Sequence, residues 1–303
     1  MKLIRELFHI IKFILLHPLN KSRKIKAVIN FFKWQISTRL IKKSVVFPWV
    51  DDARLVISAG QAGLTGNLYS GFMEYEDMIF LLHALQKSET FVDVGANAGA
   101  YTVLASKVIG SNSTAFEPIP ETSNLLSDQV QINRIENIVE IKNMGVGDKQ
   151  DELLFTNDSG AMNRVSLNDE AENTIRIKVT TLDSELNKDT NYFLKIDVEG
   201  YEYNVIEGAS DLLASNKVSA IIIELNGSGN QFGHTDIDVH KKIISYGFIP
   251  ISYNPINREI DQLDDIKTKN IGNTIYIRDI DAITERCKAA PIHTIHTAAG
   301  IKI

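Results

Sequence analysis

The stretch FVDVGANAG, residues 91–99, is an apolar run that ends in an acid and continues into a turn containing two glycines. Gly95 and Gly99 suit a sharp turn from a strand into a helix, and they let the backbone approach a ligand closely. Asn97 stands between them, and asparagine tolerates the left-handed conformation better than most residues. The same stretch also fits a tight connection that binds nothing. Polar groups at the ends of neighbouring strands decide between the two.

Around this stretch, short apolar runs alternate with segments of helical periodicity, the pattern of a mostly parallel sheet covered by helices on both faces. The predicted strands are Thr90–Val94, Ser113–Glu117, Ile138–Lys142, Tyr192–Asp197, Val218–Glu224, Phe248–Ser252 and Thr274–Arg278. The predicted helices are Ala100–Val108, one from near Pro120, Tyr203–Ala214 and Asp236–Tyr246, which Gly247 ends. Glu152–Thr156 and Thr174–Thr181 predict two more strands in an insertion, and its loop, residues 157–173, suits either a binding element or a surface excursion.

Charge divides the chain into two unlike parts. The 303 residues carry a net charge of −6, but residues 1–44 contain eleven basic residues and one acid, Glu6, so this segment is +10 and the rest is −16. We expect a basic amphipathic helical extension over residues 1–60, one α/β domain over residues 61–280 and a tail without clear periodicity over residues 281–303. The single cysteine, Cys287, excludes an internal disulfide and fits a reducing cytoplasm.

The N-terminal extension predicts two helices. The apolar run from Leu7 to Leu16 is about half the roughly 20 residues that a bilayer requires, and no cleavage site follows it, so we expect neither a span nor a signal peptide here. A second helix places apolar residues on one side: Ile25, Val28, Ile29, Phe32, Ile36 and Leu40. The pair fits an element lying on the anionic inner face of the cytoplasmic membrane, a cap on the main domain or a homo-oligomer contact. The apolar runs argue against nucleic acid as the partner.

Acidic residues stand at the ends of several predicted strands, and three of these strands bear on the choice of cofactor. Asp93 precedes the glycines, where it would repel a pyrophosphate but can hold the ammonium group of a methionine moiety, directly or through water. Glu117 ends the next strand, where carboxylates accept hydrogen bonds from ribose hydroxyls. Asp197 and Glu199 follow another strand beside the same crevice. Together these acids favour S-adenosylmethionine over a nicotinamide dinucleotide.

Four motifs resemble the FkbM family of methyltransferases, within the class I Rossmann-like methyltransferases. They are DVGANAG at 93–99, FEP at 116–118, VTTLD at 179–183 and IDVEGYE at 196–202, and the resemblance covers roughly residues 72–278. It implies a doubly wound seven-stranded sheet in the order 3-2-1-4-5-7-6 with the last strand antiparallel. It also implies S-adenosylmethionine as the cofactor and O-methyl transfer to a hydroxyl of a sugar, polysaccharide or natural product.

The candidate cofactor-binding residues are Asp93, Gly95, Asn97, Gly99, Glu117, Pro118, Asn143 and Asp197. A hydroxyl is a poor nucleophile until it loses its proton, so a base or a metal ion is needed. Asp197 is the leading catalytic candidate, and Glu199 can share a Mg²⁺ ion with it or contact the acceptor. The structural alternatives are a Lys195–Glu199 pair and a helix-capping role for Glu202.

The remaining candidates follow from position in the fold. His234 is a weaker candidate base, because a loop histidine is more often simply exposed. Glu224 ends an apolar strand, and we expect it to face the crevice mouth, since a buried charge needs a partner. Tyr69, Gly71 and Glu74 are placed to close over the methionine end. The alternative functions are a nucleotide-cofactor oxidoreductase and a non-catalytic, membrane-associated scaffold.

Overall fold

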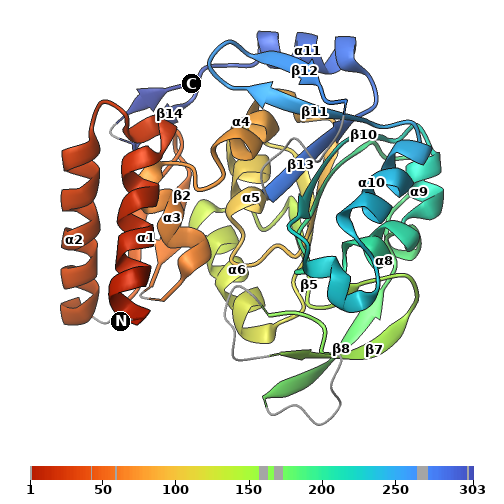
Figure 1. The fold of residues 1–303 in the computed structure, drawn as a ribbon, viewed down its shortest axis with the longest axis horizontal. Helices are drawn as coiled ribbons and strands as arrows, with labels where there is room; N and C mark the ends of the chain where they lie inside the picture. The colour runs from red at the N-terminus through yellow and green to blue at the C-terminus, as the bar shows by residue number, and fades with distance from the viewer. Residues whose placement is uncertain are drawn as a thin grey trace.

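The computed structural model describes residues 2–41, 43–58, 60–156, 163–166, 173–264, 272–298 and 300–303. An eight-stranded mixed sheet in the order β12-β11-β13-β10-β9-β3-β4-β5 forms its centre (Figure 1). The strands are β3 (Thr90–Val94), β4 (Asn112–Phe116), β5 (Val139–Lys142), β9 (Tyr192–Ile196), β10 (Val218–Leu225), β11 (Ile249–Asn254), β12 (Glu259–Gln262) and β13 (Gly272–Ile277).

The strands β10, β9, β3, β4 and β5 run parallel to one another, while β13 is antiparallel to both of its neighbours, β10 and β11. The predicted α/β, Rossmann-like sheet is therefore confirmed. The expectation of seven strands is wrong by one, because β12 pairs with β11 as an antiparallel hairpin. This edge strand was not predicted because the sequence of β12 is charged and polar, and the strands were predicted from apolar runs.

Helices cover both faces of the sheet. They are α4 (Tyr75–Ala84), α5 (Ala100–Val103), which continues as a π-helical turn over Leu104–Ile109, α6 (Pro120–Asn133), α7 (Leu182–Glu185), α8 (Glu202–Glu207), α9 (Ser210–Ala214), α10 (Asp236–Ser245) and α11 (Ile280–Ala289). Alternate strand residues feed separate cores: Phe91 joins one with Phe80 and Phe193, and Val92 joins another with Leu194 and Ile206. This alternation is the two-residue period of a strand buried on both faces.

The predicted helix Tyr203–Ala214 is two helices, α8 and α9, with a break at Gly208. A Cβ atom on Gly208 would lie 1.9 Å from the Gly147 carbonyl oxygen, so this position admits only glycine. Asp183, from the VTTLD motif, accepts hydrogen bonds from the backbone N–H groups of Asp211 and Leu212 at 2.9 and 2.8 Å. A remote carboxylate thus caps the start of α9, which local periodicity does not reveal.

The insertion forms a small three-stranded sheet beside the carboxyl edge of the main sheet (Figure 1). Its strands are β6 (Gly145–Val146), β7 (Asp151–Thr156) and β8 (Thr174–Thr180), so the two strands predicted here are present. Of the predicted loop at 157–173, residues 157–162 and 167–172 lie outside the described residues.

The N-terminal residues form a helical layer at one flank of the molecule (Figure 1). It contains α1 (Lys2–Leu16), a short 3₁₀ helix (Pro18–Asn20), α2 (Lys24–Ile41), the hairpin β1 (Val45–Pro48) and β2 (Arg54–Ile57), and α3 (Ala62–Ser70). The C-terminal hairpin β14 (Thr294–Ile295) and β15 (Ile301–Lys302) joins this layer, because Ile295 bridges to Val50. Among the described helices, none has the length and apolar character needed to cross a membrane.

Candidate functional site

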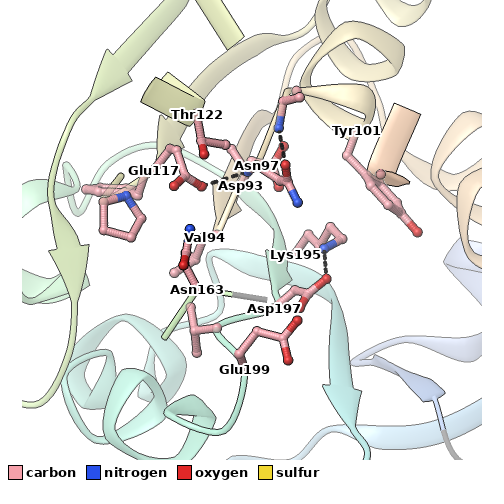
Figure 2. A pocket seen from close by; sticks show the side chains of 18 of the residues that line it. Asp93, Val94, Asn97, Tyr101, Glu117, Thr122, Asn163, Lys195, Asp197 and Glu199 are labelled. Atoms are coloured by element: carbon pink, nitrogen blue, oxygen red, sulfur yellow. Dashed lines mark hydrogen bonds and ion pairs between the residues drawn. The ribbon is translucent and has the colours of Figure 1, made fainter. Parts of the chain in front are cut away.

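A cavity of about 330 Å³ lies at the carboxyl ends of β10, β9, β3 and β4 (Figure 2). The chain crosses from one side of β3 to the other between its neighbours β4 and β9, and such a switch point is where doubly wound sheets bind ligands. Four acidic residues from the strand ends line the cavity: Asp93, Glu117, Asp197 and Glu224. The cavity therefore places the predicted acids around one space.

The loop at residues 95–99 is held in a conformation that requires its glycines. The φ angles of Gly95, Asn97 and Gly99 are +79°, +50° and +85°, all in the left-handed region. A Cβ atom on Gly95 would lie 1.8 Å from the Asp197 carbonyl oxygen. Gly95 thus lets the ends of β3 and β9 touch, which brings Asp197 beside the loop.

Glu117 is buried at the end of β4, where two backbone N–H groups hold its carboxylate. Oε2 accepts a hydrogen bond from Asn97 N and Oε1 accepts one from Ile119 N, both at 2.9 Å. Burial raises the pKa of Glu117 to about 7, although these two hydrogen bonds lower it. Each oxygen keeps a lone pair for a ligand hydroxyl.

Asp93 is 1% exposed and only half satisfied. Its Oδ2 accepts a 2.6 Å hydrogen bond from Thr102 Oγ1, while Oδ1 has no hydrogen-bond partner among the described residues. Burial raises the pKa of Asp93, and the charge of Lys195 opposes this rise. An unpaired oxygen in a cavity wall suits a donor from a ligand.

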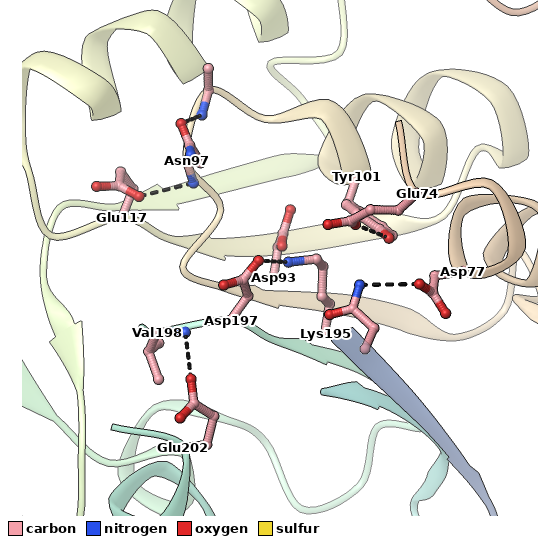
Figure 3. A network of polar contacts seen from close by, with 12 residues as sticks. Glu74, Asp77, Asp93, Asn97, Tyr101, Glu117, Lys195, Asp197, Val198 and Glu202 are labelled. Atoms are coloured by element: carbon pink, nitrogen blue, oxygen red, sulfur yellow. Dashed lines mark hydrogen bonds and ion pairs between the residues drawn. The ribbon is translucent and has the colours of Figure 1, made fainter. Parts of the chain in front are cut away.

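A buried lysine of β9, Lys195, pairs with the carboxylate that follows the same strand (Figure 3). Lys195 Nζ lies 2.9 Å from Asp197 Oδ2 and 4.8 Å from the centre of the Tyr101 ring, whose hydroxyl donates to Glu74. Burial acts to lower the pKa of Lys195, but the carboxylates of Asp197, Glu74 and Asp93 raise it above its usual range. Lys195 therefore stays charged, and its partner is Asp197 instead of Glu199.

Three carboxylates meet at the β9 and β10 end of the cavity. Asp197, Glu199 and Glu224 each offer an oxygen within 4.8 Å of the other two. Burial, together with the charges of Asp197 and Glu199, raises the pKa of Glu224 to about 8. Glu224 Oε2 has no hydrogen-bond partner in the part of the chain that the structure describes. β10 and β4 lie at opposite ends of the cavity's row of strands, so this acidic cluster is separated from Glu117.

The family model for the methyltransferase FkbM domain matches residues 93–250, just over half of the chain. The chain belongs to the FkbM methyltransferase family. No protein of curated function matches the chain.

Several solved structures share similarity with this FkbM methyltransferase. A putative rRNA methylase from Clostridium thermocellum has 10% identity over 68% of this chain and 94% of its own, with a TM-score of 0.44. An S-adenosylmethionine-dependent O-methyltransferase from Thermotoga maritima has 12% identity over 68% and 65%, with a TM-score of 0.38. A precorrin-6y C5,15-methyltransferase from Geobacter metallireducens has 11% identity over 68% and 87%, with a TM-score of 0.38.

The FkbM methyltransferase uses S-adenosylmethionine, and the cavity fits this cofactor. The unpaired Oδ1 of Asp93 suits the ammonium group, and Glu117 suits the ribose hydroxyls. Apolar side chains near Glu117 suit an adenine ring: Met144, Phe155 and Val165. When bound, the cofactor supplies a methyl group already activated by its sulfonium, so the protein's work is to position the acceptor and exclude water.

The structure brings most predicted site residues of the FkbM methyltransferase to the cavity, but not all. The lining includes Asp93, Gly95, Asn97, Gly99, Glu117, Pro118, Asp197, Glu199, Glu224 and Glu74, whereas His234, Asn143, Tyr69 and Gly71 are absent from it. The His234 ring stacks on Tyr203 with 3.7 Å between ring centres. Asn143 donates to the carbonyl oxygens of Glu117 and Pro118, so it supports the turn after β4. Glu202 accepts from the N–H groups of Val198 and Gly200.

The sequence predicted the wrong partner for Lys195 and did not reveal the roles of Tyr101 and Phe155. Lys195 lies inside the apolar run YFLKI, where a lysine needs a buried acidic partner. The run indicates that such a partner exists but not which acid it is. Tyr101 and Phe155 carried no such signal. They reach the cavity from α5 and from the insertion sheet, through packing between distant parts of the chain.

Proposed function

We propose that this FkbM methyltransferase transfers the methyl group of S-adenosylmethionine to a hydroxyl of a sugar, a polysaccharide or a related small molecule. The observation that carries the proposal is the cluster of Asp197, Glu199 and Glu224, at the end of the cavity remote from Glu117. An amine can attack with its lone pair once it is neutral, whereas a hydroxyl must lose a proton to become a good nucleophile. A group of carboxylates beside the acceptor position suits a hydroxyl.

Within this cluster the three carboxylates differ in their partners. Asp197 Oδ2 is held by Lys195, which fixes the orientation of that carboxylate. Glu224 has an oxygen without a protein partner, and burial raises its pKa to about 8, so its ionised form is a stronger base than an ordinary carboxylate. In the proposed reaction Glu224 takes the hydroxyl proton, Asp197 orients the acceptor, and Glu199 holds a neighbouring hydroxyl of a polyol.

The expectation that Asp197 and Glu199 share a Mg²⁺ ion stays a prediction. Glu224 would add a third carboxylate ligand, and carboxylate oxygens are the protein ligands that this ion prefers. Treating the enzyme with EDTA tests the idea directly. Loss of methyl transfer that added Mg²⁺ restores, with S-adenosylmethionine binding unchanged, is the expected result of a shared ion. Full activity in EDTA leaves proton transfer to the carboxylates alone.

The proposed function is tested by release of S-adenosylhomocysteine with a panel of hydroxylated acceptors, including monosaccharides and oligosaccharides. We expect release with a subset of them, and we expect Glu224→Gln to lose it while still binding S-adenosylmethionine in a calorimetric titration. Glu121→Gln, which changes an exposed acid at the start of α6, is the matched control. Transfer to nitrogen acceptors alone, or undiminished transfer by Glu224→Gln, would contradict the proposal.

A further inference from the structure

The helix α2 is apolar on two opposite faces. Its inner face is buried in the N-terminal layer: the Phe31 ring lies 5.1 Å from the Tyr69 ring, and Trp34 lies 5.4 Å from Phe47. The residues of this face follow helical spacing and are at most 8% exposed: Ala27, Phe31, Trp34 and Thr38. The inner face of α2 is therefore covered by α3 and β1 of the N-terminal layer.

The outer face of α2 is apolar and open to solvent. It consists of five residues that we call the outer stripe, with exposed fractions of 79% for Ile25, 47% for Ile29, 44% for Phe32, 58% for Ile36 and 78% for Leu40. Their spacing of three and four residues places them in one line, roughly 22 Å long at the rise of an α-helix. A continuous row of large apolar side chains is more than the scattered exposed residues of an ordinary surface.

Basic residues accompany the outer stripe. Lys26 and Lys33 are exposed, and each directly follows a stripe residue on the helix, so both lie along one edge of the stripe. The neighbouring helix α1 adds the exposed apolar residues Phe8 and Leu16 and the exposed Lys12. With the net charge of +10 over residues 1–44, this flank combines apolar and cationic character.

We propose that the outer stripe of α2 docks on an anionic phospholipid surface, with its apolar side chains in the acyl boundary and its lysines among the headgroups. The positive charge of residues 1–44 favours anionic lipid over a second copy of the chain. A symmetric contact with a second copy would bring two segments of +10 together, whereas anionic lipid neutralises them. The apolar stripe with a basic edge is also the pattern of helices that lie in a membrane interface.

The helix α2 is connected to the cavity through α3. Gln35 of α2 donates to the Tyr69 hydroxyl of α3, and the first turn of α3 supplies Gly63 and Leu64 to the cavity wall. The helix α3 therefore connects the docking helix to the wall of the cavity. The membrane proposal is independent of the methyl acceptor, because it rests on α1 and α2 alone.

Co-sedimentation of the full chain with vesicles tests the proposal. We expect binding to vesicles of phosphatidylglycerol and phosphatidylcholine, weakened by about 0.5 M salt because screening shortens the reach of the charges, and little binding to pure phosphatidylcholine. The triple variant I29S/F32S/I36S should lower the vesicle affinity by more than about 100-fold. The variant K26Q/K33Q, which keeps the apolar stripe, should lower it by about 30-fold.

The matched control is I244S/I256S, which changes two exposed isoleucines outside the N-terminal layer, at 40% and 77% exposure. It should bind vesicles like the wild type. Equal binding by wild type and the triple variant, or equal binding to neutral and anionic vesicles, would overturn the proposal. So would a dimer in solution, measured by light scattering, that the triple variant dissociates, because the stripe would then be covered by a second copy.

Discussion

Replacing Glu117 by glutamine tests the cofactor end of the site, because the substitution exchanges one carboxylate oxygen for an NH₂ group. The carboxylate accepts hydrogen bonds from two backbone N–H groups, Asn97 N and Ile119 N, each at 2.9 Å. A glutamine side chain has one oxygen and one NH₂ group, so one of these buried N–H groups faces another donor. Leaving a buried donor unsatisfied costs about 1–3 kcal/mol of stability.

The same substitution removes the negative charge that we propose as the acceptor for the ribose hydroxyls. A hydrogen bond to a charged group contributes about 1.5–3 kcal/mol, so losing one of them weakens S-adenosylmethionine binding by about 10- to 100-fold. The pKa of Glu117 is raised by burial to about 7. Since only the ionised form offers both oxygens as acceptors, cofactor affinity should fall as the pH drops through 7, by up to about tenfold per unit.

Calorimetric titration of S-adenosylmethionine at several pH values between 5.5 and 8.5 measures both effects. We expect Glu117→Gln to bind more weakly than wild type at pH 8 and to lose the pH dependence below 7, while thermal unfolding shows that it remains folded. Glu121→Gln, four residues away and exposed, should match the wild type in affinity and in pH profile. Affinity within about twofold of wild type at pH 8 would refute the assignment of Glu117 to the ribose, given the loss expected from one charged hydrogen bond.

Three further predictions concern the rest of the site. Gly95→Ala should abolish cofactor binding and lower the unfolding temperature, because its Cβ would meet the Asp197 carbonyl at 1.8 Å; Gly233→Ala, which has a similar positive φ but open space, should lose only about 1–2 kcal/mol in urea unfolding. Lys195→Met should destabilise the fold by about 3 kcal/mol in the same assay, since it leaves Asp197 without its buried partner. The pKa of Glu224 is raised to about 8 from a usual value of 4.5, so its contribution to stability is full below 4.5 and is lost as the pH rises through 8. Glu224→Gln should therefore flatten the fall in melting temperature between about pH 5 and 8.

The sheet and the acids at its edge could be predicted because each depends on local patterns. Apolar runs marked the strands that became β3, β4, β9 and β10, and the acid after each run had to emerge where parallel strands end together. Asp93, Glu117, Asp197 and Glu224 accordingly meet in one cavity. The glycines between Asp93 and α5 were informative for the same reason, since a positive φ leaves a mark in the sequence.

The features that escaped prediction depend on contacts between distant residues. The break between α8 and α9 needs Gly147 against Gly208 and the carboxylate of Asp183, neither of which affects local helical periodicity. The position of His234, stacked on Tyr203, depends on the path of a whole loop. The packing of α2 could not be predicted for a different reason. It has two apolar faces, and periodicity identified the outer stripe without indicating which face the main domain would cover.

We propose that one cavity holds S-adenosylmethionine with its ribose at Glu117 and its sulfonium toward the acidic cluster of Asp197, Glu199 and Glu224. A crystal structure of the full chain with S-adenosylhomocysteine tests this most directly. We expect the ribose hydroxyls on the Glu117 carboxylate, the ammonium group on Asp93 and the sulfur facing Asp197. A ligand bound in the reverse orientation, or outside this cavity, would contradict it.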